Sequence, residues 1–163
     1  MKNLFILFVV IVFLILSACT QKVDLEAEKA QVKTVVDQFK QAFETNNMEL
    51  FSKIYAHDPD MVIIGTDSAE YWVGWEPLQV SVEKQFASYE TKKLSVRKQV
   101  IKVHVSGKVA WFSEIWDWDL LAQSEAVNLL GIRLTGVLEK RNGGWVIVQA
   151  HVSVPVYGTA AAY

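Results

Sequence analysis

The sequence has few of the residues from which disulfides and metal sites are built. Its single cysteine, Cys19, excludes a disulfide within the chain, and its three histidines show no paired ligand spacing such as His-Glu-x-x-His. The phosphate-binding glycine loop, the dinucleotide fingerprint and the Gly-x-Ser-x-Gly nucleophile motif are also missing. We therefore expect neither a metal nor a cofactor.

An excess of charge of either sign is also lacking. Sixteen basic residues against 18 acidic ones give a formal charge of −2, so there is no electrostatic reason to expect a nucleic acid partner. The apolar fraction of 52% and the aromatic fraction of 12% exclude a disordered chain. The 163 residues suit one domain with a substantial core.

The N-terminal segment differs from the rest of the chain. Residues 4–16 form an unbroken run of 13 apolar residues behind Lys2, which is the layout of a secretory leader. As a helix rising about 1.5 Å per residue, this run is too short to cross a ~30 Å hydrocarbon core. Leu16-Ser17-Ala18-Cys19 resembles the lipobox of bacterial lipoproteins, which are cut before the cysteine. The resemblance implies a signal peptide over residues 1–18 and a lipidated Cys19.

Residues 19–24 would then form a short lipidated tether. Several acyl chains on Cys19 suffice for stable attachment, so we expect a membrane-anchored lipoprotein of the bacterial cell envelope that faces the periplasm or the exterior. A simple signal peptide with an incidental cysteine is the alternative.

The remaining chain reads as helices first and strands afterwards. Asp24 and Asn47 are suited to cap two helices, Pro77 lies in the first part of a third, and Asn142-Gly143 predicts a hairpin. Alternating or buried apolar runs predict strands over residues 61–64, 94–105, 109–120, 126–141 and 145–154. This order predicts an α+β domain over residues 25–157, with three helices packed on an antiparallel sheet, and a tail at 158–163.

Several short motifs, in a fixed order over about residues 28–156, resemble SnoaL-like domains of the nuclear transport factor 2-like superfamily. They are Asp60-Met-Val-Ile-Ile-Gly65, Glu70-Tyr-Trp-Val-Gly74, Ser106-Gly-Lys-Val-Ala-Trp111, Arg133-Leu-Thr135-Gly-Val, Gly144-Trp145-Val-Ile147 and His151-Val-Ser153-Val-Pro155. The resemblance implies a cone of curved sheet closed by three helices, usually dimeric and often with an apolar pocket. The superfamily includes isomerases, polyketide cyclases, dehydratases and a kinase association domain, so the fold does not define the function.

Strand 109–120 has two faces, and its orientation decides which groups reach the pocket. If Asp117 faces inward, it is a candidate general base whose pKa burial would raise. If Trp116 faces inward, the pocket is an aromatic box with Glu114 as its ionisable group. Asp117 and Asp119 can also be solvated charges at the edge of the sheet. Tyr55 and Asp67 are the only loose matches to the tyrosine and aspartates of the isomerases.

The predicted pocket is apolar and large enough for a small ligand. Its predicted walls are Tyr71, Trp75, Phe86 and Trp116. Its predicted polar anchors are Arg133 and His151, which lie directly opposite each other if Val137 pairs with Ile147. Such a site suits an anionic or carbonyl-bearing apolar molecule. The alternative is that the side chains of Arg133 and His151 point outward, to solvent or to a dimer partner.

Three functions remain open at this point. The first is a lipid-anchored domain that binds a small apolar molecule. The second is a cofactor-free isomerase, cyclase or dehydratase that acts on such a molecule. The third is a homodimeric interaction module at the cell envelope, assembled through an apolar outer face of the sheet.

Overall fold

The computed structural model describes residues 22–158 and 161. The predicted signal peptide and Cys19 lie outside this part of the chain, as does most of the predicted tail. Within the described ranges, no helix is both long and apolar enough to cross a membrane.

Three helices form where the capping residues and the apolar spacing predict them. They are α2 (Leu25–Glu44), α3 (Met48–Ile54) and α4 (Trp75–Ser88). The Asp24 carboxylate accepts the backbone N–H groups of Glu26 and Ala27 at 3.1 and 3.0 Å, and the Asn47 side chain accepts that of Leu50 at 2.9 Å. Both caps satisfy N–H groups that a helix leaves free at its N-terminus.

Six strands form one sheet in the order β2-β1-β6-β5-β4-β3. The strands are β1 (Val62–Ile64), β2 (Tyr71–Val73), β3 (Tyr89–Val103), β4 (Val109–Ala122), β5 (Glu125–Arg141) and β6 (Gly144–Ser153). The expected sheet was antiparallel throughout, but β1 runs parallel to β6, so the sheet is mixed. β2 and β3 are the two edge strands and do not pair with each other, so the sheet stays open and does not close into a cone.

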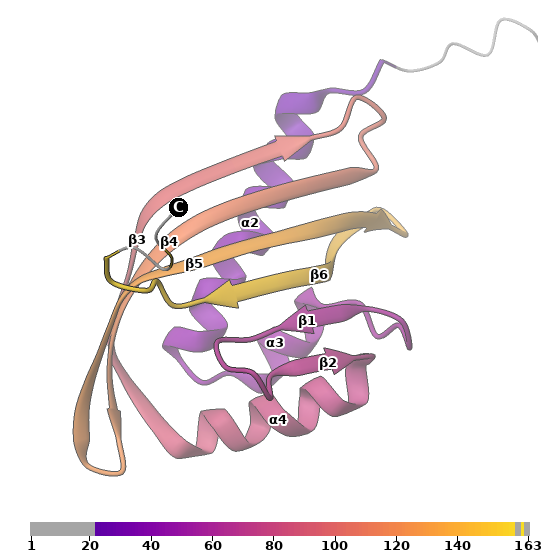
Figure 1. Ribbon diagram of the computed structural model, residues 1–163. Helices are drawn as coiled ribbons and strands as arrows, with labels where there is room; N and C mark the ends of the chain where they lie inside the picture. The colour runs from indigo at the N-terminus through magenta and orange to yellow at the C-terminus, as the bar shows by residue number, and fades with distance from the viewer. Residues whose placement is uncertain (1–21, 159–160, 162–163) are drawn as a thin grey trace, which may run out of the picture.

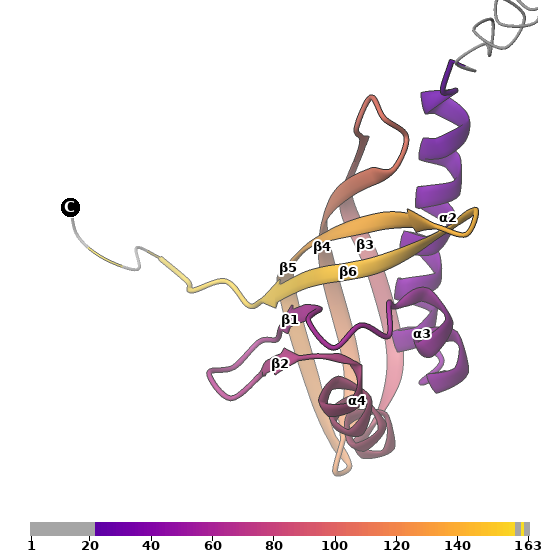
Figure 2. The same cartoon turned by 90° about the vertical axis from the view of Figure 1, so that its right-hand side faces the viewer.

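The α+β prediction is confirmed, since three helices pack on this sheet. In Figure 1, α2 runs behind the long strands, and α4 lies at the end of the molecule below β2. Figure 2 shows α2 and α3 together on one side of the sheet. Alternate residues of β4 are buried on this inner face, among them Ala110, Phe112 and Trp116.

One expected boundary is wrong. The strand after the third helix was expected to begin at Leu94, whereas β3 begins at Tyr89, directly after α4 ends at Ser88. The extended backbone of Tyr89 is fixed by Asn46, whose side-chain amide donates to the carbonyls of Phe86 and Tyr89 at 2.8 Å each. Asn46 lies 43 residues away from Tyr89, so local periodicity carries no sign of this contact.

The long strands contain β-bulges, which add one residue to one strand of a pair. Irregular register occurs at Lys92 and Arg97 between β3 and β4, at Gly131 between β4 and β5, and at Val148 between β5 and β6. Because side chains alternate with a period of two, each extra residue exchanges the inward and outward faces of everything beyond it. This exchange decides which predicted site residues reach the interior.

Candidate functional site

An aromatic cavity lies between the inner face of the sheet and the three helices. Its volume is about 110 Å³, and residues from all three helices and five of the six strands line it. The lining residues are Phe39, Phe43, Phe51, Tyr55, Ile63, Ile64, Gly65, Thr66, Glu70, Trp72, Leu78, Val82, Gln85, Trp116, Trp118, Leu129, Ile132, Leu134 and Val152. Most of this wall is apolar, as in typical small-molecule sites.

Trp116 forms the sheet side of the aromatic wall. Its ring centroid lies 5.4 Å from that of Phe39 and 6.0 Å from that of Phe43, both on α2. Phe43 also meets Trp118 edge to face at 5.7 Å. Rings at these separations make favourable edge and offset contacts, which stabilise the wall.

A buried carboxyl group holds the Trp116 indole in place. Glu114, only 2% exposed, accepts the Trp116 Nε1–H at 2.6 Å and the Gln99 side-chain amide at 2.6 Å. Burial raises the pKa of Glu114 above its ordinary value, against the lowering effect of these two hydrogen bonds. Glu114 is not part of the cavity wall, so it acts on the cavity through Trp116.

Tyr55 places a hydroxyl-bearing ring in the cavity wall. The residue is 4% exposed, and its position is fixed because the following residue, Ala56, donates its N–H to the carbonyl of Ile147 at 2.9 Å. Burial raises the pKa of Tyr55 well above its ordinary value, so its hydroxyl stays protonated. A neutral hydroxyl in an apolar wall can donate a hydrogen bond to a ligand or accept one from it.

The polar side of the cavity comes from the turn between β1 and β2 and from α4. Glu70 Oε2 accepts the Thr66 N–H at 2.5 Å, the Thr66 hydroxyl at 3.0 Å and the Asp67 N–H at 3.3 Å. Glu70 Oε1 receives only a long contact of 3.4 Å from the Gln85 amide. One carboxylate oxygen is thus held by the turn, and the other retains capacity to accept hydrogen bonds.

Among the four predicted wall residues, only Trp116 lines the cavity. Trp75 and Phe86 are buried in the adjoining core, where each packs against Phe51 at about 6 Å between ring centroids. Tyr71 is 60% exposed and does not line the cavity. Its neighbour Trp72 takes the inward place, because successive residues of β2 point to opposite faces.

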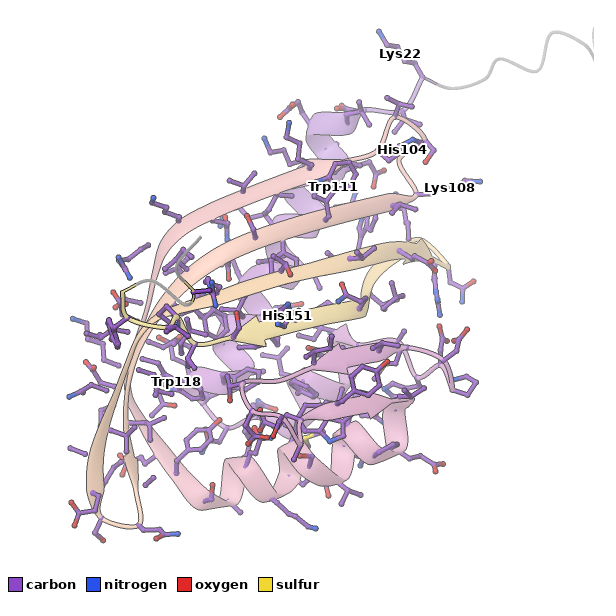
Figure 3. The ribbon with its side chains drawn as sticks, viewed as in Figure 1. Lys22, His104, Lys108, Trp111, Trp118 and His151 are labelled. Carbon is purple, nitrogen blue, oxygen red and sulfur yellow. The ribbon has the colours of Figure 1, made fainter. Side chains whose placement is uncertain are left out.

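Arg133 and His151, the predicted anchors, lie on the outer face of the sheet. Val137 pairs with Gln149 and not with Ile147, so Arg133 lies opposite Ser153, and His151 lies opposite Thr135. The expected register is therefore wrong by two residues. The hairpin, which pairs Arg141 with Gly144 and Leu138 with Ile147, accounts for one of them, and the bulge at Val148 accounts for the other. Figure 3 shows His151 on the face turned away from α2.

Each of these two side chains is exposed there. The Arg133 guanidinium donates to the Val154 carbonyl at 3.2 Å. His151 is exposed and does not line the cavity. Among the described residues that line the cavity there is no lysine, arginine or histidine. The anion-binding group expected from the sequence is thus absent from this wall.

The orientation of β4 shows which of its two faces lines the cavity. Trp116 faces inward, and Asp117 faces outward with a partner that the sequence did not suggest. Arg97, at the bulge of β3, pairs with the Asp117 carboxylate at 2.6 Å, and the Gly131 N–H donates to it at 2.8 Å. Asp117 therefore holds two bulges together and does not reach the cavity as a general base.

Asp67 accepts the Ala69 N–H at 2.8 Å within the β1–β2 turn and does not line the cavity, unlike Tyr55. Over residues 22–158, no group of three His, Cys, Asp or Glu side chains could hold a metal ion. The predicted site left out Glu70, Trp72, Gln85 and Trp118, all of which line the cavity. Trp72 and Trp118 had a usable signal in the alternation of β2 and β4, whereas Glu70 and Gln85 had none.

Comparison with known proteins identifies the class. The model of the family described as "SnoaL-like domain" matches residues 32–157. The chain belongs to this family of SnoaL-like domains. No curated protein matches it in sequence.

Solved structures of similar shape support the same fold. A nuclear transport factor 2-like superfamily protein from Salmonella enterica has a TM-score of 0.71 at 18% identity, covering 85% of this chain and 99% of the other. A protein from Xanthomonas campestris, described as a putative calcium/calmodulin-dependent protein kinase II association domain, has a TM-score of 0.66 at 23% identity, with coverages of 85% and 97%. A putative dehydratase from Streptomyces avermitilis has a TM-score of 0.65 at 17% identity, with coverages of 80% and 98%. Identities this low establish the fold alone.

Proposed function

We propose that this SnoaL-like domain binds a small apolar molecule in the cavity between its sheet and helices. The observation that carries the proposal is a preformed aromatic cavity with a protonated hydroxyl, Tyr55, and a carboxylate, Glu70, in its wall. Apolar walls with a few placed polar groups are typical of ligand sites. Protein cores normally contain few voids larger than a water molecule, so a cavity of this volume is consistent with a binding site.

The volume limits the size of the bound group. A cavity of about 150 Å³ in another protein holds benzene. A cavity of about 110 Å³ therefore suits one six-membered ring after small side-chain adjustments, or the apolar end of a longer molecule. Benzyl alcohol is a suitable probe because its ring fills the apolar part and its hydroxyl can reach a polar group.

The test is a nuclear magnetic resonance titration with benzyl alcohol that observes the six indole N–H signals. We expect saturable shifts for Trp72, Trp116 and Trp118, which line the cavity, and none for Trp111, which lies on the outer face (Figure 3). The absence of saturable shifts at all three cavity tryptophans would contradict the proposal.

Two adjacent leucines provide matched variants for this titration. Leu129 lines the cavity, whereas Leu130 is 51% exposed on the outer face. Leu129→Phe fills the cavity and is expected to abolish binding, and Leu130→Phe is expected to leave it unchanged. Arg133→Ala is a further control that should also leave binding unchanged, since Arg133 lies outside the cavity. Equal effects of Leu129→Phe and Leu130→Phe on binding would show that the ligand binds elsewhere.

Acid–base catalysis on the bound molecule is the second candidate function. It is favoured by the presence of a proton donor, Tyr55, and a proton acceptor, Glu70, in one apolar wall. An isomerase or dehydratase of this type begins by removing a proton next to a carbonyl group. Hydrogen–deuterium exchange into cyclohexanone should then be accelerated by the protein and lost in Glu70→Gln; no acceleration over buffer would remove this candidate.

We also propose that the domain is carried as a lipoprotein through Cys19. The leader and the Leu16–Cys19 lipobox support this proposal. Expressed in a bacterial host with its leader, the protein should fractionate with membranes, and Cys19→Ser should be released or remain uncut. Recovery of the wild-type protein in the soluble fraction, cleaved at another bond, would contradict lipidation.

Homodimer formation through the outer face of the sheet is supported by its exposed apolar side chains. Val100, Trp111 and Leu130 are 53%, 46% and 51% exposed. Leaving such area wet is unfavourable by ~25 cal/mol per Å². Sedimentation analysis should give a dimer that Trp111→Glu dissociates, and a monomer at high micromolar concentration would contradict the dimer.

A further inference from the structure

The charge in the cavity wall points to the chemical class of the ligand. Glu70 is the only charged side chain among the lining residues, and no ion pair to it is found in the described part of the chain. The remaining polar side chains of the wall, from Tyr55, Thr66 and Gln85, are uncharged. An anionic ligand would therefore meet a carboxylate without any compensating cation.

The Glu70 carboxylate is held in one orientation by the β1–β2 turn. Three donors from Thr66 and Asp67 fix Oε2, and the Gly65 N–H donates to the Glu70 carbonyl at 2.7 Å. Gly65 has no side chain, and a Cβ atom at this position would overlap Glu70 Oε2. The position of the Glu70 carboxylate against the β1–β2 turn therefore requires glycine at residue 65.

The second oxygen of Glu70 is the one available to a ligand. Its contact with the Gln85 amide is long, at 3.4 Å, and Gln85 also donates to the Ser81 hydroxyl at 3.2 Å. A protonated amine could form a charge-assisted hydrogen bond with Glu70 Oε1, which is stronger than a neutral one. Aromatic rings such as those of Trp72 and Trp118 also attract cations through their faces.

We propose, building on the proposed ligand-binding function, that the cavity selects molecules with an apolar body and a protonated amine and disfavours carboxylates. The apolar body occupies the aromatic wall, and the ammonium group meets Glu70 Oε1. The carboxylate attracts a ligand cation and repels a ligand anion at the same place, so the expected difference in affinity between ligands of opposite charge is about tenfold or more.

The test compares three probes with the same ring: benzylamine, benzyl alcohol and benzoate. At neutral pH and low salt, benzylamine should bind about tenfold more tightly than benzoate, with benzyl alcohol between them. Glu70→Gln keeps an oxygen for the turn donors and removes the charge, so the preference should disappear while benzyl alcohol still binds. Glu76→Gln removes an exposed charge from the same region and should leave the preference unchanged.

The outcomes separate this proposal from the one on which it rests. If benzyl alcohol binds but benzylamine binds no more tightly than benzoate, the charge selection is wrong and the ligand-binding function remains. A preference for benzylamine that persists in Glu70→Gln also overturns the role of Glu70. If none of the three probes binds to the folded protein, both proposals fail.

Discussion

The titration of Glu114 should make the free energy of unfolding of this protein depend on pH. It is buried between β4 and α2, and its two donors come from Gln99 and Trp116. Nearby, Asp37 further raises its pKa and Lys33, which pairs with Asp37 at 2.6 Å, lowers it. Replacing Glu114 tests whether its carboxyl group or only its shape is needed.

Glu114→Ala should destabilise the fold by about 2–4 kcal/mol. The Trp116 indole N–H would lose its acceptor inside the protein, which costs about 1–3 kcal/mol. The removed side chain would also leave a small void beneath α2, adding to the loss. With a urea m-value of ~2 kcal/mol per M, the unfolding midpoint should fall by about 1–2 M.

Glu114→Gln should instead change the pH dependence. The pKa of Glu114 is higher in the folded state than in the unfolded chain, so the folded state retains the proton over a range in which the unfolded chain loses it. The stabilising effect of that proton is complete below the ordinary glutamate pKa and is lost as pH rises through the raised, folded-state pKa. Relative to wild type, Glu114→Gln should therefore gain stability as pH rises over this window.

The assay is urea unfolding at 25 °C, followed by far-ultraviolet circular dichroism between pH 4 and pH 8. Glu83→Gln is the matched control, because Glu83 is exposed on α4. Parallel pH profiles for wild type and Glu114→Gln would refute the argument that burial raises this pKa. A fully stable Glu114→Ala variant would refute the role of Glu114 as the acceptor for Trp116.

Further expectations concern capping, packing and the cavity wall. Asn47→Ala removes the cap of α3 and should lower the melting temperature by about 2–4 °C in calorimetry, whereas an unchanged value would show that the cap is not needed. Gly136→Ala places a Cβ 2.5 Å from the Phe112 ring and 2.9 Å from the Gln149 carbonyl, so urea unfolding should show a loss of about 1–3 kcal/mol. Gly65→Ala should displace the Glu70 carboxylate and abolish the preference for benzylamine in a titration, and a retained preference would contradict the arrangement of the turn.

The helices could be predicted because their signals are local. Asp24 and Asn47 cap the helices they were expected to cap, and the spacing of Val32, Val36 and Phe39 gives the buried face of α2. The Asn142-Gly143 hairpin also forms, with φ of 50° and 84° at the two residues. Such positive angles are what its two-residue turn requires.

The site could be predicted only in part because strand alternation is sensitive to one extra residue. The β4 face with Trp116 was one of two stated alternatives, and the structure selects it. Arg133 and His151 were assigned on the assumption of regular strands, and the bulge at Val148 reversed His151 relative to Trp145 and Ile147. Nothing local in the sequence marks that bulge, because its cause is the fit between whole strands.

The polar part of the cavity was missed for a different reason. Glu70 and Gln85 meet only after β1, β2 and α4 have packed, and 15 residues separate them in the chain. Each alone reads as an ordinary surface residue. Tyr55 was noticed as a loose match, but its place in the wall depends on its bridge to Ile147, far along the chain.

Val23 packs against the β3–β4 turn, so the N-terminal end of the described domain is held at one end of the molecule. Gly107 lies so close to Val23 that a Cβ there would overlap the valine side chain, and Figure 3 shows Lys22, His104 and Lys108 together at this end. The 20 residues of α2 span about 30 Å from here towards the end of the molecule that holds α4. If Cys19 carries the proposed lipid, the membrane attachment lies on the side of the first turn of α2, whereas the cavity lies towards the last turns of α2 and towards α4.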